Sequence, residues 1–280
     1  MAGTRFDSSG GFQYVLADIH GQTELFQSIM EQIQLREEDT LYVLGDVIDR
    51  HPGGPAILNH LISMPNVRML LGNHEYMMLN ALDPFRFTGN SEIGVETIIR
   101  NVENWYANGG QITQRSLRHM PQYVQESLFA YLRNLRLSYR IEVNGQLFEL
   151  VHAAPPSLFE RHRGRYDSVL HFSVWYRWKA EEAVDDSNAT VVFGHTPTIL
   201  LGQKTDPLTI YYGDHRIGID CGAAYADDSE MYGFPRGRLA CLRLNDMKEF
   251  YSGTLVQIRY GICNSTSYVI NCLCHSFPCG

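Results

Sequence analysis

The chain has 280 residues and a mass of 31.9 kDa, a length typical of one large α/β domain or two small ones. Hydrophobic residues make up 44% of the chain and charged residues 19%, which supplies a core and excludes a disordered polymer. A net charge of −8 and a pI of about 5.7 argue against nucleic-acid binding through a basic surface. The sequence has neither an apolar run of membrane-spanning length nor a cationic leader, so we expect a cytoplasmic protein without membrane contacts.

The first third of the chain alternates short apolar runs with amphipathic segments. Buried parallel strands are predicted at three short apolar runs, residues 14–17, 41–44 and 67–71. Helices are predicted where apolar residues recur at helical spacing, at residues 23–35, from Pro55 onward and at residues 73–82. This βαβαβα order is typical of a parallel sheet with helices packed on it.

The rest of the chain is first helical and then returns to strands. Residues 83–135 are predicted to be mostly helical and irregular. The pair Asn144-Gly145 is a strong hairpin signal and lies between two predicted strands, residues 138–143 and 146–151. Further strands are predicted at residues 190–193, 208–212, 217–220 and 239–244.

The composition changes after residue 251. Residues 252–280 contain no Asp, Glu or Lys, and they hold four of the six cysteines. We therefore expect a catalytic domain over residues 1–251 and an atypical cysteine-containing extension over residues 252–280 that lies outside it. The main fold must hold without a framework of disulfides.

Residues able to bind a metal follow five of the predicted strands. They are Asp18, His20, Asp46, Asn73, His152 and His195. Ligands in open α/β sheets gather at the carboxyl ends of the strands, so we expect these side chains to converge. Imidazole, carboxylate and amide groups without a thiolate suit Mn²⁺, Fe or Zn²⁺. Six ligands exceed the need of one catalytic ion, whereas two ions that share a carboxylate fit, an arrangement used for displacement at phosphorus.

Each of these fragments also has an ordinary structural explanation. Asn73 alone is a good N-cap for a helix, and a single buried histidine is usually a satisfied core residue. Trp105 and Trp175 are predicted to be packing residues rather than platforms for a base. The coincidence of five such strand ends in one chain favours the shared metal site.

The chain resembles the phosphoprotein phosphatase branch of the calcineurin-like metallophosphoesterases. The resemblance rests on five motifs: Asp18-Ile-His20-Gly, Gly45-Asp-Val-Ile-Asp49-Arg50, Gly72-Asn-His-Glu75, His152-Ala-Ala and Gly194-His-Thr196. The small phage lambda-type protein phosphatases are similar in three further segments: Trp105 with Asn108-Gly109-Gly110, Trp175-Tyr176-Arg177, and Ile219-Asp220-Cys221-Gly222-Ala223. The likeness covers about residues 12–245. It implies an α/β fold, a four-layer α/β/β/α sandwich with two mixed sheets facing each other and the metals at one rim.

The resemblance also implies a role for each matching residue. It assigns six residues to two divalent ions, Mn²⁺ in the first place with Fe or Zn²⁺ as alternatives: Asp18 and His20 for the first ion, Asp46 as the bridge, and Asn73, His152 and His195 for the second. His74 matches the general acid and Asp49 its carboxylate partner. Arg50 and Arg177 match the arginines that bind the substrate phosphate.

The function implied is hydrolysis of phosphoserine and phosphothreonine in a phosphoprotein or phosphopeptide, by direct attack of a hydroxide that bridges the metals. One departure bears on the substrate. The protein phosphatases carry an arginine two residues before the metal-binding Asn, and Leu71 stands there. The branch that hydrolyses diadenosine tetraphosphate also tends to lack that arginine, so a symmetrical dinucleoside tetraphosphate hydrolase is the alternative. A non-catalytic phosphate-binding pseudo-phosphatase is a remote one, because every ligand position and the His74–Asp49 pair are filled. The sequence leaves the oligomeric state open.

Overall fold

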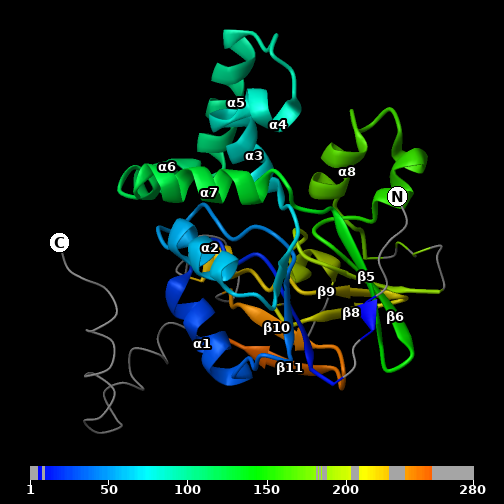
Figure 1. The fold of residues 1–280 in the computed structure, drawn as a ribbon. Helices are drawn as coiled ribbons and strands as arrows, with labels where there is room; N and C mark the ends of the chain where they lie inside the picture. The colour runs from blue at the N-terminus through cyan, green and yellow to red at the C-terminus, as the bar shows by residue number, and fades with distance from the viewer. Residues whose placement is uncertain are drawn as a thin grey trace, which may run out of the picture.

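The computed structural model describes residues 6–7, 10–180, 182, 184, 188–202, 208–226 and 237–253. Two mixed sheets lie at its centre (Figure 1). The first has the strand order β11-β10-β2-β3-β4, with β2 at Gln13–Leu16, β3 at Thr40–Val43, β4 at Val67–Met69, β10 at Ala240–Arg243 and β11 at Lys248–Tyr251. The second has the order β1-β5-β6-β7-β9-β8, with β1 at Phe6–Asp7, β5 at Ser138–Val143, β6 at Gln146–Val151, β7 at Thr190–Phe193, β8 at Tyr211–Gly213 and β9 at Arg216–Gly218.

The strands that matter for the site run parallel within each sheet. In the first sheet β2, β3 and β4 are parallel neighbours, and β10 is antiparallel to β2. In the second, β6, β7 and β9 are parallel neighbours, and the predicted hairpin joins β5 to β6. The carboxyl ends of each parallel set therefore lie together at one edge of its sheet.

Helices cover the sheets and form the middle of the chain. Their bounds are α1 Thr23–Ile33, α2 Gly54–Ser63, α3 Asn73–Leu82, α4 Pro84–Thr88, α5 Val95–Ala107, α6 Gly110–Arg118, α7 Gln122–Leu132 and α8 Val169–Trp175. Short 3₁₀ helices are η1 Pro156–His162, η2 Thr198–Leu201 and η3 Ala223–Tyr225. The predicted helical spacing is confirmed in α1, whose apolar stripe is buried and which ends at Gln34 with a left-handed φ of 46°.

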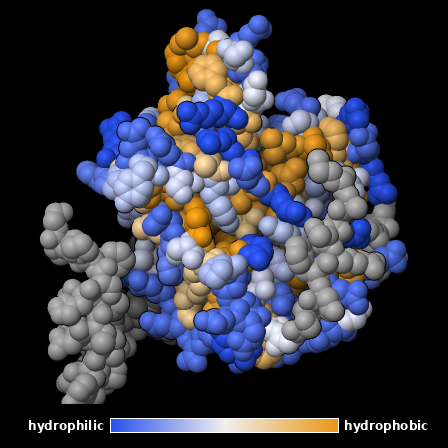
Figure 2. All heavy atoms as spheres, in the orientation of Figure 1, coloured by the Kyte–Doolittle hydropathy of each residue, from blue (hydrophilic) through white to orange (hydrophobic). Residues whose placement is uncertain are grey.

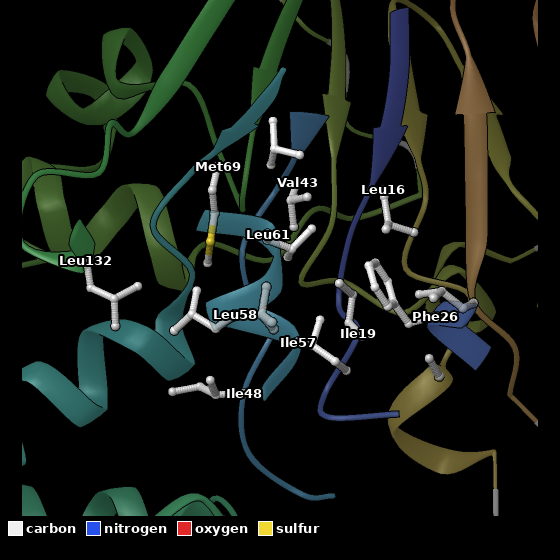
Figure 3. Packing of buried hydrophobic residues seen from close by; sticks show 14 of the residues in the cluster. Leu16, Ile19, Phe26, Val43, Ile48, Ile57, Leu58, Leu61, Met69 and Leu132 are labelled. Atoms are coloured by element: carbon white, nitrogen blue, oxygen red, sulfur yellow. The ribbon is translucent and has the colours of Figure 1, made fainter. Parts of the chain in front are cut away.

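Strand alternation divides the core of the first sheet between its two faces. Leu16 and Val43 face the helices, where they join a cluster with Leu58 of α2 (Figure 3). Val15 and Leu44, each one position away along the chain, pack instead into a cluster shared with the second sheet. Each fully buried aliphatic side chain contributes about 1.5–3 kcal/mol relative to an exposed one, so both faces hold the sheet in place.

The second sheet is covered in the same way. Leu150 of β6 faces the first sheet, whereas Val151 and Phe193 face outward and pack against Phe172 of α8. The successive layers are thus the helices that cover the first sheet, the first sheet, the second sheet, and helix α8. The predicted four-layer α/β/β/α sandwich with two mixed sheets is confirmed.

The predicted helical middle of the chain forms α4 to α7, which stand above the first sheet in Figure 1. Most of the surface in Figure 2 is hydrophilic, and apolar side chains gather at the projecting end of this helical region. Phe85, Val95 and Ile99 are exposed there. None of the helices in the described ranges combines the length and apolar character that crossing a bilayer requires.

Helix α8 and strand β11 are two of the elements that were not predicted from the sequence. Helix α8 is only seven residues long, too short to display helical periodicity, and it begins where the Ser168 hydroxyl accepts a hydrogen bond from the His171 backbone N–H at 3.1 Å. Strand β11 carries exposed Lys248 and Glu249, which mask its pairing with β10 in the sequence. The proposed extension lies outside the described residues beyond Gly253.

Candidate metal centre

The parallel strands bring the predicted ligands to one place. The register aligns Leu16 with Val43 and Val43 with Met69, so the chain leaves β2, β3 and β4 side by side. Asp18, Asp46 and Asn73 follow these strand ends, and His152 and His195 follow β6 and β7 of the facing sheet. All of them, together with His20, are at most 4% exposed.

Asp46 lies at the centre of the cluster. Its Oδ2 atom is 3.8 Å from His20 Nε2 and 4.0 Å from His74 Nε2, and its Oδ1 atom is 3.6 Å from His152 Nε2. Two groups of donor atoms, each within 4.8 Å of one another, share this residue: His20, Asp46 and His74, and Asp46, His152 and His195. One carboxylate thus faces two potential ion positions.

Two histidine ring nitrogens of the site, in His152 and His195, lack a matching hydrogen-bond partner among the described residues. The His152 Nδ1–H group donates to the Leu44 carbonyl at 2.7 Å, which leaves the Nε2 lone pair facing Asn73 Oδ1 at 3.0 Å. His195 Nε2 is buried and has no hydrogen-bond partner in the described part of the chain. Opposed acceptors and an orphaned buried nitrogen fit a bound cation.

The charges of the site also fit divalent ions. Burial lowers the pKa of His20, His152 and His195, and the neutral form favoured in this way is the one that ligates metals. Burial, followed by the neighbouring carboxylates of Asp220 and Asp46, raises the pKa of Asp18. Crowded buried carboxylates and neutral imidazoles, with no thiolate among them, form a donor set suited to Mn²⁺, Fe or Zn²⁺.

Asp18 occupies a distinct place within this set. Its two carboxylate oxygens accept a hydrogen bond from the His195 backbone N–H, at 3.1 and 3.0 Å. It is not a member of the group of His20, Asp46 and His74. The structure therefore links Asp18 directly to the loop after β7, in the opposite sheet.

His74 differs from the other histidines of the site. Its Nδ1–H group donates to Asp49 Oδ2 at 2.8 Å, and both residues are buried. Burial by itself would lower the pKa of His74, but the carboxylates of Asp46 and Asp49 outweigh it and raise that pKa. A cationic imidazole with Nε2 directed toward Asp46 is suited to donate a proton at the site.

The two predicted phosphate-binding arginines are held by different partners. Arg50 Nη1 donates to the Tyr225 hydroxyl at 3.0 Å, and the guanidinium lies 5.3 Å from the centre of that ring. Arg177 Nη1 donates to the His195 carbonyl at 2.8 Å. The positive charges of both arginines act on Asp220, which places them at the same buried acidic cluster.

Backbone strain is concentrated at the site. Six of its non-glycine residues have a left-handed φ between 49° and 70°: Asp18, His20, Asp46, Asp49, Arg50 and His195. Each such residue costs about 1–3 kcal/mol and persists only where its surroundings hold it. Gly72 permits one close approach, since a Cβ there would lie 2.2 Å from Asp46 Oδ1.

Comparison with known proteins decides the family. Residues 14–210 match the model of the calcineurin-like phosphoesterases. The chain belongs to this family. A symmetrical bis(5′-nucleosyl)-tetraphosphatase of Acidovorax ebreus (strain TPSY) is 40% identical over 70 residues, which is 24% of this chain and 25% of that protein. The enzyme of the same name from Serratia proteamaculans (strain 568) is 35% identical over 68 residues, 24% of each chain.

These matches span about a quarter of the length of the curated relatives. A solved structure of a protein provisionally assigned as a diadenosine tetraphosphatase covers 89% of this chain and 96% of its own, with a TM-score of 0.54 and 16% identity. That similarity shows that the two chains share a fold.

Sequence reasoning gave no functional role to four residues that the structure places at this candidate site. They are Glu75, Trp105, Thr113 and Asp220. Asp220 follows β9 just as the predicted ligands follow their strands, so the same strand-end rule could have found it. Glu75 could have been noticed as the acidic residue in the first turn of α3. The sequence did not show that Trp105 and Thr113 would meet Asp49, because these contacts join distant parts of the chain.

Proposed function

We propose that this phosphoesterase hydrolyses symmetrical dinucleoside tetraphosphates with the aid of two divalent metal ions. The observation that carries the hydrolase proposal is the position of the Asp46 carboxylate between two groups of buried imidazoles. His20 and Asp18 would hold one ion with Asp46, and a second set would hold the other: Asp46, Asn73, His152 and His195. Mn²⁺ is the ion we propose first, with Fe or Zn²⁺ as alternatives. Such ions, when bound, lower the pKa of water and polarise a phosphoryl oxygen.

The chain's own residues complete the chemistry. Because His74 Nδ1–H is fixed to Asp49, the proton on Nε2 is the one available for the departing oxygen. General acids contribute about 10²–10⁴-fold where the leaving group is poor. Arg50 and Arg177 carry guanidinium groups that would bind the non-bridging phosphate oxygens and offset charge as it develops.

Leu71 bears on the choice of substrate. It occupies the position of an arginine in the protein phosphatases, yet it is 3% exposed and packs in the cluster between the first sheet and its helices. A core residue thus stands where the protein phosphatases have a phosphate-binding arginine. The names of the curated relatives point the same way, toward a dinucleoside tetraphosphate.

Hydrolysis of phosphoserine or phosphothreonine is the second candidate. It is supported by Trp105 and Gly109, which belong to the segment that resembles lambda-type phosphatases. Trp105 bonds to Asp49, and Gly109 contacts Arg50. The partner on this reading is a phosphoprotein or phosphopeptide. The cytoplasmic location stays a prediction.

A substrate comparison under one metal tests the proposal. Metal-stripped protein is loaded with Mn²⁺, and the release of ADP from diadenosine tetraphosphate is compared with phosphate release from a phosphoserine peptide. We expect two molecules of ADP per dinucleotide and a higher kcat/KM for this substrate. Faster turnover of the peptide would favour the second candidate. Binding of phosphate with no turnover of either substrate, under Mn²⁺, Mg²⁺, Ni²⁺ and Zn²⁺ in turn, would indicate a pseudo-phosphatase.

A further inference from the structure

The carboxylate of Asp49 depends on very few donors. Asp49 is 0% exposed, and its Oδ2 atom accepts two hydrogen bonds, from His74 Nδ1 at 2.8 Å and from Trp105 Nε1 at 2.9 Å. Its Oδ1 atom is buried with no partner in the described residues. A buried carboxylate needs such donors to satisfy its oxygens and to hold its rotamer. The indole therefore supplies one of the two bonds that fix this side chain.

The backbone around Asp49 also needs external support. Asp49 and Arg50 are consecutive non-glycine residues with φ of 70° and 67°. The Asp49 backbone N–H donates to the Thr113 hydroxyl at 2.9 Å, and the Arg50 N–H donates to the Gly109 carbonyl at 3.4 Å. Both acceptors lie in or beside α6, so the α5–α6 segment holds the strained turn that presents the dyad.

Trp105 is itself held in a fixed place by this segment. Its side chain is fully buried, and a Cβ on Gly110 would lie 2.3 Å from the indole atom Cε2. The ring thus rests directly on the backbone at the start of α6. This contact leaves the indole little freedom to turn away from Asp49.

We propose that Trp105 is a positioning residue for proton donation by His74, acting through Asp49. The inference rests on the proposed hydrolase function, since it assigns the His74–Asp49 pair to the leaving-group step. The indole N–H holds Asp49 Oδ2 where it accepts the hydrogen bond from His74 Nδ1 and so orients the imidazole. Removing the N–H should therefore impair the step in which a poor leaving group departs, more than it impairs substrate binding.

The kinetic test compares two aryl phosphates that differ in their leaving groups. For Trp105→Phe, which keeps a large aromatic side chain, we expect kcat for phenyl phosphate to fall about 10–100-fold. The fall for p-nitrophenyl phosphate should be several times smaller, because nitrophenolate departs without a proton. KM should change little for either ester. Equal losses for the two esters, or no loss, would overturn the inference.

Trp178→Phe is a matched control. Trp178 is also buried, and its Nε1–H donates to the Ala153 carbonyl at 2.7 Å rather than to the dyad. Any loss in this variant should be the same for both esters. Diadenosine tetraphosphate is assayed alongside in the wild type. Turnover of the aryl phosphates without turnover of the dinucleotide would refute the proposed substrate and leave the test of Trp105 intact.

A measurement without turnover tests the hydrogen bond itself. In the metal-free protein, the proton resonance of the Trp105 indole is identified by its loss in Trp105→Phe. We expect it to move upfield in Asp49→Asn, which removes the charge of the acceptor, while the Trp178 indole resonance stays in place. An unmoved Trp105 resonance would refute the inference even if the enzyme were inactive on every ester tested.

Discussion

Replacing Glu75 with glutamine tests how the loop that carries Asp46 is held. Glu75 is 0% exposed, and its carboxylate accepts backbone hydrogen bonds at both oxygens. Oε2 accepts from Asp46 at 2.8 Å and Gly72 at 3.2 Å, and Oε1 accepts from Val47 at 2.8 Å and Ile48 at 3.4 Å. One side chain thus binds the turns after two neighbouring strands.

A glutamine at this site keeps one oxygen and replaces the other with an amide NH₂ group. The two backbone N–H groups that were bonded to the replaced oxygen then face the amide NH₂ group, which is a donor, and lose their acceptor. A buried donor left without a partner costs about 1–3 kcal/mol, and one bond of each pair is long, so we expect the free energy of unfolding to fall by about 2–4 kcal/mol. The affinity for Mn²⁺ should fall as well, because the turn at Asp46 loses its support.

Urea unfolding of the metal-free protein measures the first effect, and calorimetric titration with Mn²⁺ measures the second. Glu31→Gln is the matched control, because it makes the same chemical change on the exposed face of α1. An unfolding free energy for Glu75→Gln within about 0.5 kcal/mol of the control would show that Glu75 does not hold the turn.

Three further predictions concern the binding of Mn²⁺, the contact of Gly194 with Asp18, and the hydrogen bond between Arg50 and Tyr225. In thermal unfolding, Mn²⁺ at one hundred times its dissociation constant should stabilise the wild type by about 2.7 kcal/mol. Asp46→Asn should abolish most of this gain. Equal gains in both proteins would contradict the proposed binding of Mn²⁺ at Asp46. Gly194→Ala would bring a Cβ to 2.2 Å from Asp18 Oδ2 and should weaken Mn²⁺ binding in calorimetry, whereas Gly94→Ala, with nothing within 4 Å, should not. Tyr225→Phe removes the hydroxyl that accepts from Arg50 and should raise KM for the phosphate ester about 3–10-fold with kcat retained; an unchanged KM would separate Tyr225 from substrate binding.

Much of the fold follows from local patterns. The buried runs that became β2, β3 and β4 are short and mostly apolar, and the stripe of α1 has a helical period, so sequence alone separates strand from helix. Helix α8 escapes this reasoning because a single seven-residue element shows less than two full turns of periodicity.

The sequence alone determined the identity of the candidate ligands. Asp18, Asp46 and Asn73 follow parallel strands, and parallel strands share the direction of their ends, so their convergence is a consequence of chain order. The sequence determined equally that no arginine stands at Leu71. Both the candidate ligands and the absence of an arginine at position 71 can be read from the sequence without any interatomic distance.

Only the tertiary structure decided what surrounds the His74–Asp49 pair. Trp105 is 56 residues from Asp49 in the chain, and Thr113 is 64 residues away, yet each bonds to it. Hydrophobic periodicity reports which face of an element is buried, but it does not report which buried partner a polar atom meets. That choice is made when helices α5 and α6 pack over the turn after β3, because a buried donor and a buried acceptor must then find each other.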